Sequence, residues 1–239
     1  MKLDLLAIAA HPDDVELTCG GTLLKAAGQG YKTGILDLTA GEMGTRGTPD
    51  RRLRESAKAA RILRVTHREN MRFPDAHLKV NDEYKLALAE RIRALKPRTV
   101  ILPYWEGRHP DHYTAAQLGY ESCFLAGLKQ LPIKGEPFRP FKILYATLYH
   151  RQATPTFVVD ITPYFKRRYK AILAYHSQFR PKASDKKSKV DIPLDRLHHE
   201  VNLLVGYFGQ LAGVEYAEPF VVKEIMQVED VVNLPVRSV

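Results

Sequence analysis

Cysteine is scarce in this sequence, and long hydrophobic runs are missing from it. Cys19 and Cys123 are the only cysteines among 239 residues, which excludes a disulfide scaffold and offers no CxxC pair for a thiolate metal site. No apolar run approaches the roughly 18 residues that a membrane-spanning helix needs. Asp4, Asp13 and Asp14 interrupt the N-terminal segment where a secretory signal peptide has neutral residues. We therefore expect a soluble, cytoplasmic protein.

The composition is that of an ordinary globular protein. Hydrophobic residues make up 45% of the chain and charged residues 26%, which excludes disordered, collagenous and coiled-coil chains. A chain of this length can bury a full core without cross-links. No internal repeat or low-complexity stretch divides it, so we expect residues 1–239 to form one domain.

The chain is basic, with 36 Lys and Arg against 27 Asp and Glu and a formal net charge of +9. Such an excess is typical of proteins that bind nucleic acid, membranes or small anions, but it also arises from charged helix faces, the interpretation we favour. The alternative of a basic nucleic-acid-binding module lacks support, because the sequence has no zinc-finger spacing, no aromatic RNA-binding strand and no recognition-helix pattern.

Apolar runs alternate with segments of helical periodicity along most of the chain. Strands are predicted at Leu3–Ala10, Tyr31–Thr39, Met71–Phe73, Thr99–Leu102, Ile143–Tyr149 and Phe157–Asp160. Helices are predicted at Val15–Gln29, Asp50–Leu63, Asp82–Leu95, Tyr113–Leu128, Pro163–Tyr175 and Leu194–Leu211. This alternation predicts an α/β fold, a Rossmann-like three-layer sandwich whose mainly parallel sheet carries helices on both faces. The polar, basic stretch Phe179–Asp191 is predicted to be a surface loop or a flap over a site.

Two His-Pro-Asp turns follow strands of the predicted sheet. His11-Pro12-Asp13-Asp14 comes after the first strand, where a dinucleotide-binding protein would have GxGxxG, and His109-Pro110-Asp111-His112 comes after the fourth. Ligands of open parallel sheets bind outside the carboxyl ends of the strands, so both turns are expected at one edge. There they supply the histidine and carboxylate ligands of a catalytic metal site.

Each of these side chains has a predicted role. His11, Asp14 and His112 are the predicted metal ligands, because a catalytic Zn²⁺ takes three protein ligands and keeps one position open. Asp13, beside a ligand, is the predicted general base. His109, held protonated by Asp111, is predicted to stabilise an oxyanion or to act as the acid. Ligands of this kind also accept Fe²⁺ or Co²⁺, and two His with one carboxylate also occur in Fe(II) oxygenases. The carboxylate base beside a ligand favours hydrolysis.

These motifs carry a resemblance that covers most of the chain. AHPDD followed by HPDH, within an α/β chain of this length, resembles the LmbE or PIG-L family of zinc-dependent N-acetylglucosaminide deacetylases. Four stretches, AHPDDVEL, TAGEMGTRGTPDRRLRE, PYWEGRHPDH and AYHSQF, resemble the branch that deacetylates N-acetylglucosaminyl-malate in bacillithiol biosynthesis. The resemblance implies a small anionic sugar conjugate as substrate and a homo-oligomer, such as a hexamer. Another N-acetylglucosamine conjugate, such as a mycothiol precursor, is the alternative.

The resemblance also assigns residues outside the two turns. It implies that Arg52 and Asp75 contact the substrate, and position alone suggests that Arg108 binds a malate carboxylate as a guanidinium fork. Relatives place an oxyanion-stabilising Tyr near the late helix, where this sequence has Leu197. The candidates that remain open for its role are His198, His199, Tyr104 and Tyr175.

Overall fold

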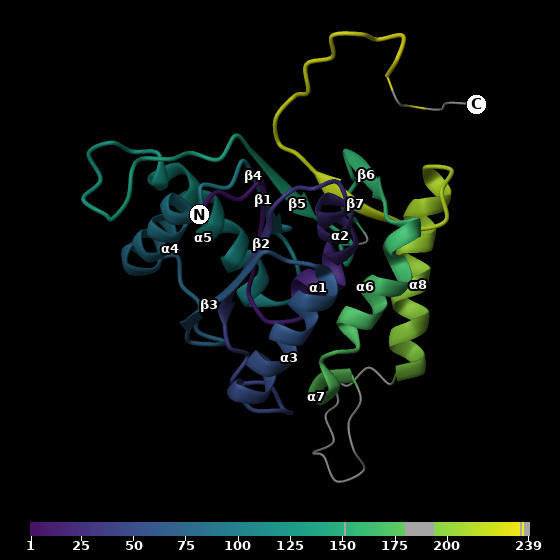
Figure 1. Cartoon of the computed structure of the whole chain (residues 1–239), viewed down its shortest axis with the longest axis horizontal. Helices are drawn as coiled ribbons and strands as arrows, with labels where there is room; N and C mark the ends of the chain where they lie inside the picture. The colour runs from purple at the N-terminus through teal and green to yellow at the C-terminus, as the bar shows by residue number, and fades with distance from the viewer. Residues whose placement is uncertain (151, 180–193, 235, 237–239) are drawn as a thin grey trace.

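A computed structural model describes residues 1–150, 152–179, 194–234 and 236. Within these residues the chain forms one mixed sheet with helices on both faces (Figure 1). This architecture confirms the predicted α/β fold. Most of the predicted loop or flap at Phe179–Asp191 lies outside the described residues.

The sheet has the strand order β3-β2-β1-β4-β5-β7-β6. Its strands are β1 (Leu5–Ala9), β2 (Thr33–Thr39), β3 (His67–Phe73), β4 (Thr99–Pro103), β5 (Lys142–Ala146), β6 (Phe157–Asp160) and β7 (Ala217–Val221). The first five strands along the chain pair in parallel, whereas β7 runs antiparallel to both β5 and β6. The chain leaves β1 toward β2 on one side and later returns to β4 on the other. This reversal between β1 and β4 is where ligands bind in such sheets.

The helices divide between the two faces of the sheet. They are α1 (Asp14–Thr18), α2 (Gly20–Gly28), α3 (Pro49–Leu63), α4 (Asp82–Leu95), α5 (Pro110–Ala126), the 3₁₀ turn η1 (Thr162–Tyr164), α6 (Phe165–Ile172), α7 (His176–Phe179) and α8 (Leu194–Leu211). Side chains of α4 and α5 pack with Leu6 and Ile8 of β1 in one core. Side chains of α1, α2, α3, α6 and α8 pack with Ala7 and Ala9 in the other. β1 is thus buried on both faces, as its unbroken apolar run predicts.

The predicted helix at Val15–Gln29 is two helices, because the chain turns at Cys19, whose φ is −147°. Glu218 of β7 caps the second helix: its carboxylate accepts hydrogen bonds from the backbone N–H of Gly21 at 2.9 Å and of Thr22 at 2.7 Å. The sequence pattern missed the break because this cap comes from a residue almost two hundred positions away. α1 is consequently a separate short helix with its own orientation.

The strand β7 was also missed. Its sequence, AEPFV, is short and contains Pro219, a residue that normally argues against a strand because it cannot donate to the ladder. Here the Pro219 carbonyl still accepts a hydrogen bond from the Thr147 backbone N–H. Tertiary packing between β5 and β6 therefore overrides the local propensity.

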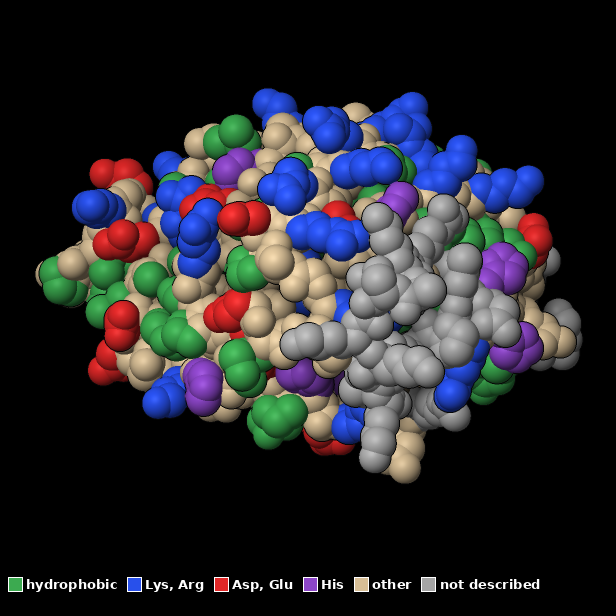
Figure 2. All heavy atoms as spheres, turned by 90° about the horizontal axis from the view of Figure 1, so that it is seen from below, with side chains coloured by type: hydrophobic (Ala, Val, Ile, Leu, Met, Phe, Trp, Pro, Cys, Tyr) green, Lys and Arg blue, Asp and Glu red, His purple; other side chains and the backbone are tan. Residues whose placement is uncertain are grey.

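The basic excess lies on the surface as mixed charge. Figure 2 shows Lys and Arg side chains gathered along one edge of the face seen there, with Asp and Glu side chains among and beside them. This distribution agrees with the interpretation as charged helix faces. Across the residues described, no helix combines the length and apolar character required to cross a membrane.

Candidate metal centre

The turn after β1 aims its two aspartates at different partners. Asp13, the residue before α1, has φ 110°, a value that costs a non-glycine residue conformational energy and is held by its surroundings. Asp14 opens the helix, and its carboxylate accepts a hydrogen bond from the backbone N–H of His11 at 2.9 Å. The strained turn thus separates the predicted base from the predicted ligand next to it.

The three predicted metal ligands come together around the Asp14 carboxylate. His11 Nδ1 lies 3.3 Å from Asp14 Oδ2, and His112 Nε2 lies 3.3 Å from Asp14 Oδ1. Four ligand atoms placed tetrahedrally about 2.0–2.1 Å from a zinc ion are also about 3.3 Å apart. The donor atoms of His11, Asp14 and His112 all lie within 4.8 Å of one another. The spacing and the chemistry of this donor set therefore fit a zinc ion.

Two further carboxylates hold the other ring nitrogen of His11. Its Nε2 lies 3.0 Å from Asp75 and 3.3 Å from Asp111. Burial lowers the pKa of His11, but hydrogen bonds to Asp111, Asp14 and Asp75 overcome this and raise it to about 12. With Nε2–H donating to these carboxylates, Nδ1 is the nitrogen that faces the metal position. This is the outer-shell support common to metal-bound histidines.

One predicted pairing is therefore corrected. The Asp111 carboxylate contacts His11 and accepts a hydrogen bond from the Ala76 backbone N–H at 2.8 Å, not from the His109 ring as we expected. The pKa of His109 is lowered by burial and by the nearby His11 and His112, so Asp111 does not hold His109 protonated. Asp75, which the resemblance assigns to substrate contact, bonds to His11 and to the Met43 backbone N–H and also lines the cavity beside them.

His109 caps the N-terminus of α5. Its Nδ1 accepts a hydrogen bond from the Asp111 backbone N–H at 3.3 Å, and its ring stacks against His112 with 4.7 Å between centroids. The cap fixes the tautomer of the neutral ring, because Nδ1 accepts and Nε2 must carry the proton. His109 therefore presents an N–H donor beside the metal ligands.

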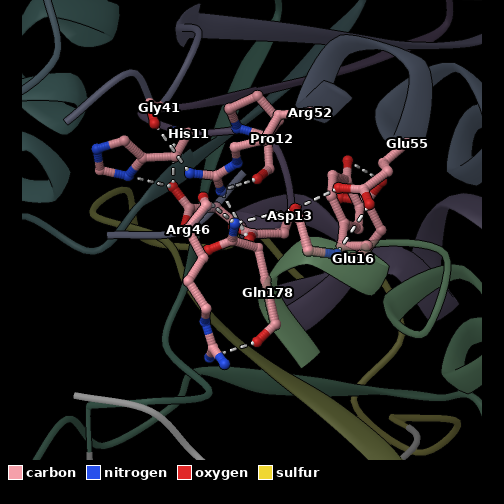
Figure 3. A network of polar contacts seen from close by, with 12 residues as sticks. His11, Pro12, Asp13, Glu16, Gly41, Arg46, Arg52, Glu55 and Gln178 are labelled. Carbon is pink, nitrogen blue, oxygen red and sulfur yellow. Dashed lines mark hydrogen bonds and ion pairs between the residues drawn. The ribbon is translucent and has the colours of Figure 1, made fainter. Parts of the chain in front are cut away.

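Arg52 binds the predicted base. Its guanidinium donates to Asp13 Oδ2 at 2.8 Å and to the Pro12 carbonyl at 2.7 Å. It also donates to the Gly41 carbonyl at 3.4 Å (Figure 3). Burial raises the pKa of Asp13 to about 7, although the charge of Arg52 opposes this shift. Arg52 is buried and both of its terminal nitrogens donate within the chain, so it orients Asp13.

The glycine-rich loop 40–48 is tied to α7. Arg46 donates to the Gln178 carbonyl at 3.0 Å, and the Gln178 side chain donates back to the Arg46 carbonyl at 2.9 Å. Glu55 of α3 accepts hydrogen bonds from the backbone and side chain of Ser177. Figure 3 shows this network running from His11 past Asp13 to Gln178. The network holds the loop over the metal ligands.

Two cavities, each of about 400 Å³, meet at the metal ligands. The first, which we call the polar cavity, is lined by His11, Asp13, Asp14, Met43, Gly44, Arg52, Asp75, Ala76, His109 and His112. The second, which we call the apolar cavity, lies between α1 and α8 over the strands and shares Asp14, His109 and His112 with the first. Arg108, whose side chain is exposed, also lines it.

The four candidates for the role of the oxyanion-stabilising tyrosine differ in where they lie relative to the cavities. Tyr104 lines the apolar cavity. Tyr175 is fully buried and donates its hydroxyl to Glu16. His198 is exposed and bonds to Asn202, and His199 is also exposed. Of the four, Tyr104 is therefore the one that the structure brings beside the metal ligands.

Two lining residues, Tyr149 and His150, were missed. Both follow β5 and line the apolar cavity, but neither is among the site residues predicted from the sequence. The signal was available, since β5 is a predicted parallel strand whose carboxyl end reaches the same edge as the others.

Comparisons with known proteins agree with this geometry. Residues 6–123 match the PIG-L family, described as GlcNAc-PI de-N-acetylase. A diacetylchitobiose deacetylase of Thermococcus kodakarensis is 30% identical over 229 residues, covering 90% of this chain and 80% of that protein. The chain belongs to the PIG-L family.

Other relatives of this PIG-L protein extend the likeness. The crystal structure of the conserved protein TT1542 from Thermus thermophilus superposes with a TM-score of 0.85 at 41% identity, covering 95% of this chain and 98% of that one. A probable N-acetyl-α-D-glucosaminyl L-malate deacetylase 2 of Bacillus anthracis is 24% identical over 202 residues, with 78% and 86% of the two chains covered.

Proposed function

We propose that this PIG-L protein is a metal-dependent amide hydrolase that removes the N-acetyl group from an N-acetylglucosamine conjugate. The observation that carries the proposal is the cluster of His11, Asp14 and His112 with an oriented carboxylate, Asp13, directly beside it. Family membership and the 30% identity to a diacetylchitobiose deacetylase support the same reaction.

His11, Asp14 and His112 would hold the metal. The chemistry that a bound Zn²⁺ supplies is polarisation of the amide carbonyl and a lowered pKa for water, and Fe²⁺ or Co²⁺ would suit the same ligands. Hydrolysis is favoured over oxygenase chemistry because Asp13 is placed as a base.

The protein's own groups perform the proton transfers and stabilise charge. Asp13, fixed by Arg52, accepts the proton of the attacking water and delivers it toward the departing amine. His109 donates through Nε2–H to the oxygen that gains negative charge as the carbonyl is attacked. Tyr104, which lines the adjoining cavity, is the second candidate donor. The polar cavity, with Asp75 and Arg52 on its wall, accommodates the sugar hydroxyls.

We infer further that the sugar carries malate, as in bacillithiol biosynthesis. Arg108 is exposed and directly precedes His109, so its planar guanidinium can bind a carboxylate beside the site with two hydrogen bonds. The 24% identity to the malate-conjugate deacetylase supports this substrate, whereas the similarity to the diacetylchitobiose deacetylase makes the uncharged disaccharide the alternative.

The test is acetate release by the zinc-loaded protein from N-acetylglucosaminyl-malate, N,N′-diacetylchitobiose and free N-acetylglucosamine. We expect kcat/KM to be highest for the malate conjugate. Arg108→Ala should raise KM for that conjugate by about tenfold and leave KM for N-acetylglucosamine within about twofold, the loss expected for one charge-assisted hydrogen bond. Preference for the disaccharide, or an equal effect of Arg108→Ala on all substrates, would contradict the malate assignment.

A further inference from the structure

The strands β1 and β5 present alanines to the apolar cavity and larger side chains to the opposite face, whereas β4 presents Ile101 to the cavity. On β1, Ala7 and Ala9 face the cavity, whereas Leu6 and Ile8 fill the core under α4 and α5. On β5, Ala146 faces the cavity and the much larger Tyr145 faces away. The alanines of β1 and β5 leave space between these strands and the helices, where the other face has bulky residues.

The floor of this cavity is apolar, whereas the polar side chains of Thr18, Tyr104, Tyr149 and His150 line other parts of it. Ala7, Ala9, Ile101 and Ala146 form its floor, and each is at most 3% exposed. Val15 and Leu197 stand on its α1 and α8 sides. Sugar hydroxyls buried there would lack hydrogen-bond partners, which is unfavourable. An alkyl chain makes no hydrogen bonds in water, so it would lose none by entering this part of the cavity.

The cavity's charged lining residues lie elsewhere. Arg108 is exposed and Glu200 is half-buried, while Asp14, His109 and His112 belong to the metal site. The cavity therefore runs from the metal ligands and a charged mouth to an apolar interior. An amide at the metal ligands has a sugar on its nitrogen and an acyl group on its carbonyl carbon, and two cavities with different lining residues begin at this point.

We propose that the apolar cavity is an acyl-chain pocket, and that this enzyme hydrolyses N-acylglucosamine conjugates whose acyl chains are longer than acetyl. The proposal rests on the proposed amide hydrolysis and names its substrate class. A cavity of about 400 Å³ far exceeds an acetyl methyl group, which is comparable in volume to one water of roughly 30 Å³. Roughly six carbon atoms would fill about half of it.

Hydrolysis of a matched substrate series tests the proposal. The zinc-loaded protein is assayed for amine release from N-acetyl-, N-butyryl-, N-hexanoyl- and N-octanoylglucosamine. We expect kcat/KM to rise from acetyl to hexanoyl by up to about fourfold for each added methylene group. A fall of about tenfold or more between acetyl and butyryl would overturn the pocket, because it would show that the site closes behind the methyl group.

Substitutions on the floor and wall should shift chain-length preference in opposite directions. Ala146→Leu fills the pocket and should lower the hexanoyl-to-acetyl ratio of kcat/KM by about tenfold, whereas Leu197→Ala enlarges it and should move the optimum to octanoyl. Ala171→Leu is the matched control, since Ala171 of α6 is equally buried in the same core but does not line the cavity. Its ratio should stay at the wild-type value. If Ala146→Leu does not fold, Leu197→Ala and Leu197→Phe carry the same test.

Binding of the released carboxylic acid tests the proposed pocket independently of the proposed amide hydrolysis. Hexanoate should raise Tm more than acetate does, with or without metal, and Ala146→Leu should abolish the difference. A hexanoate effect without cleavage of any amide would support the pocket and contradict the proposed function. Equal Tm shifts for both acids would overturn the pocket. An Ala146→Leu variant that changes KM for N,N′-diacetylchitobiose but not the hexanoyl-to-acetyl ratio would also overturn it, by assigning the cavity to the amine side.

Discussion

Asp13 and Asp14 are adjacent in the chain but contact different partners. Asp14 faces His11 and His112, whereas Asp13 faces Arg52, whose guanidinium also binds the Pro12 carbonyl. One left-handed residue in the turn is enough to separate them. Since Asp13 does not lie among the metal ligands, catalysis and metal binding should be separable by substitution.

Asp13→Asn should lower kcat by about 100- to 10,000-fold, because the amide cannot take the proton of the attacking water. Its metal content, measured by atomic absorption after dialysis, should stay near one equivalent per chain. Asp14→Asn is the matched control and should lose most of the metal. Loss of metal in the Asp13 variant would mean that Asp13 is a ligand.

Asp111→Asn should weaken zinc binding by about 10- to 100-fold, because the carboxylate that holds His11 Nε2 is lost. Competition with a chromophoric chelator measures this change. The expected signature is an activity that returns when zinc is raised. If Asp111 served His109 instead, kcat would fall at saturating zinc with the zinc affinity unchanged.

At the scale of elements, the α1–α2 junction depends on one buried ion pair. Arg168 of α6 lies 2.9 Å from Glu218 and donates to the Glu16 carbonyl at 3.1 Å, while Glu218 caps α2. Both side chains are fully buried. A buried pair of this kind is costly to break from one side, because the partner is left charged and unpaired.

Arg168→Met should reduce the free energy of unfolding by about 3–5 kcal/mol. Denaturation in urea measures this loss as a lower midpoint at an unchanged slope. In the double variant Arg168→Met with Glu218→Gln, part of the loss should be recovered, since the introduced amide is neutral while its carbonyl still accepts from α2. Equal stabilities for the single and double variants would show that the pair is not coupled.

Sequence periodicity predicted most elements because their apolar patterns are set locally. The strand β1 and the helix α4 appear where their patterns predict them. The break at Cys19 and the strand β7 could not be predicted this way, since both depend on Glu218 and its neighbours packing against distant elements.

The same difference between local patterns and distant packing applies to the candidate site. The chain positions of His11, Asp14 and His112 after parallel strands predicted that they would meet, and the structure brings their donor atoms together. The partners of Asp111 and Asp75 could not be predicted, because which carboxylate reaches His11 depends on the register of β3 beside β2 and on the turn at Ala76. The placement of Tyr149 and His150 could have been predicted from the strand order, but they were missed.

At the scale of the whole molecule, the reversal of strand order between β1 and β4 places the candidate metal ligands and the apolar cavity at one edge of the sheet. The metal ligands follow these two strands, and the apolar cavity opens over the same pair. A metal bound by these residues would therefore join the turn after β1 to the start of α5, two parts of the chain about a hundred residues apart. Such a link should stabilise the fold as well as complete the site.

Zinc at about 100 times its dissociation constant should raise the free energy of unfolding by about 2.7 kcal/mol, because binding is expected only in the folded state. Thermal unfolding with and without zinc measures this as a rise in Tm. His112→Ala should remove the zinc-dependent rise. Cys123→Ala, far from the ligands in the opposite core, is the control and should keep it.

The central claim is that amide hydrolysis needs both the metal and Asp13. The most direct measurement is acetate release from an N-acetylglucosamine conjugate by the purified protein, before chelation, after chelation and after zinc is restored, with Asp13→Asn carried through each step. We predict that activity disappears on chelation, returns with zinc, and stays at least about 100-fold below the wild-type rate in the variant at full metal occupancy. Acetate release that survives chelation, or that continues near the wild-type rate in metal-loaded Asp13→Asn, would contradict the account.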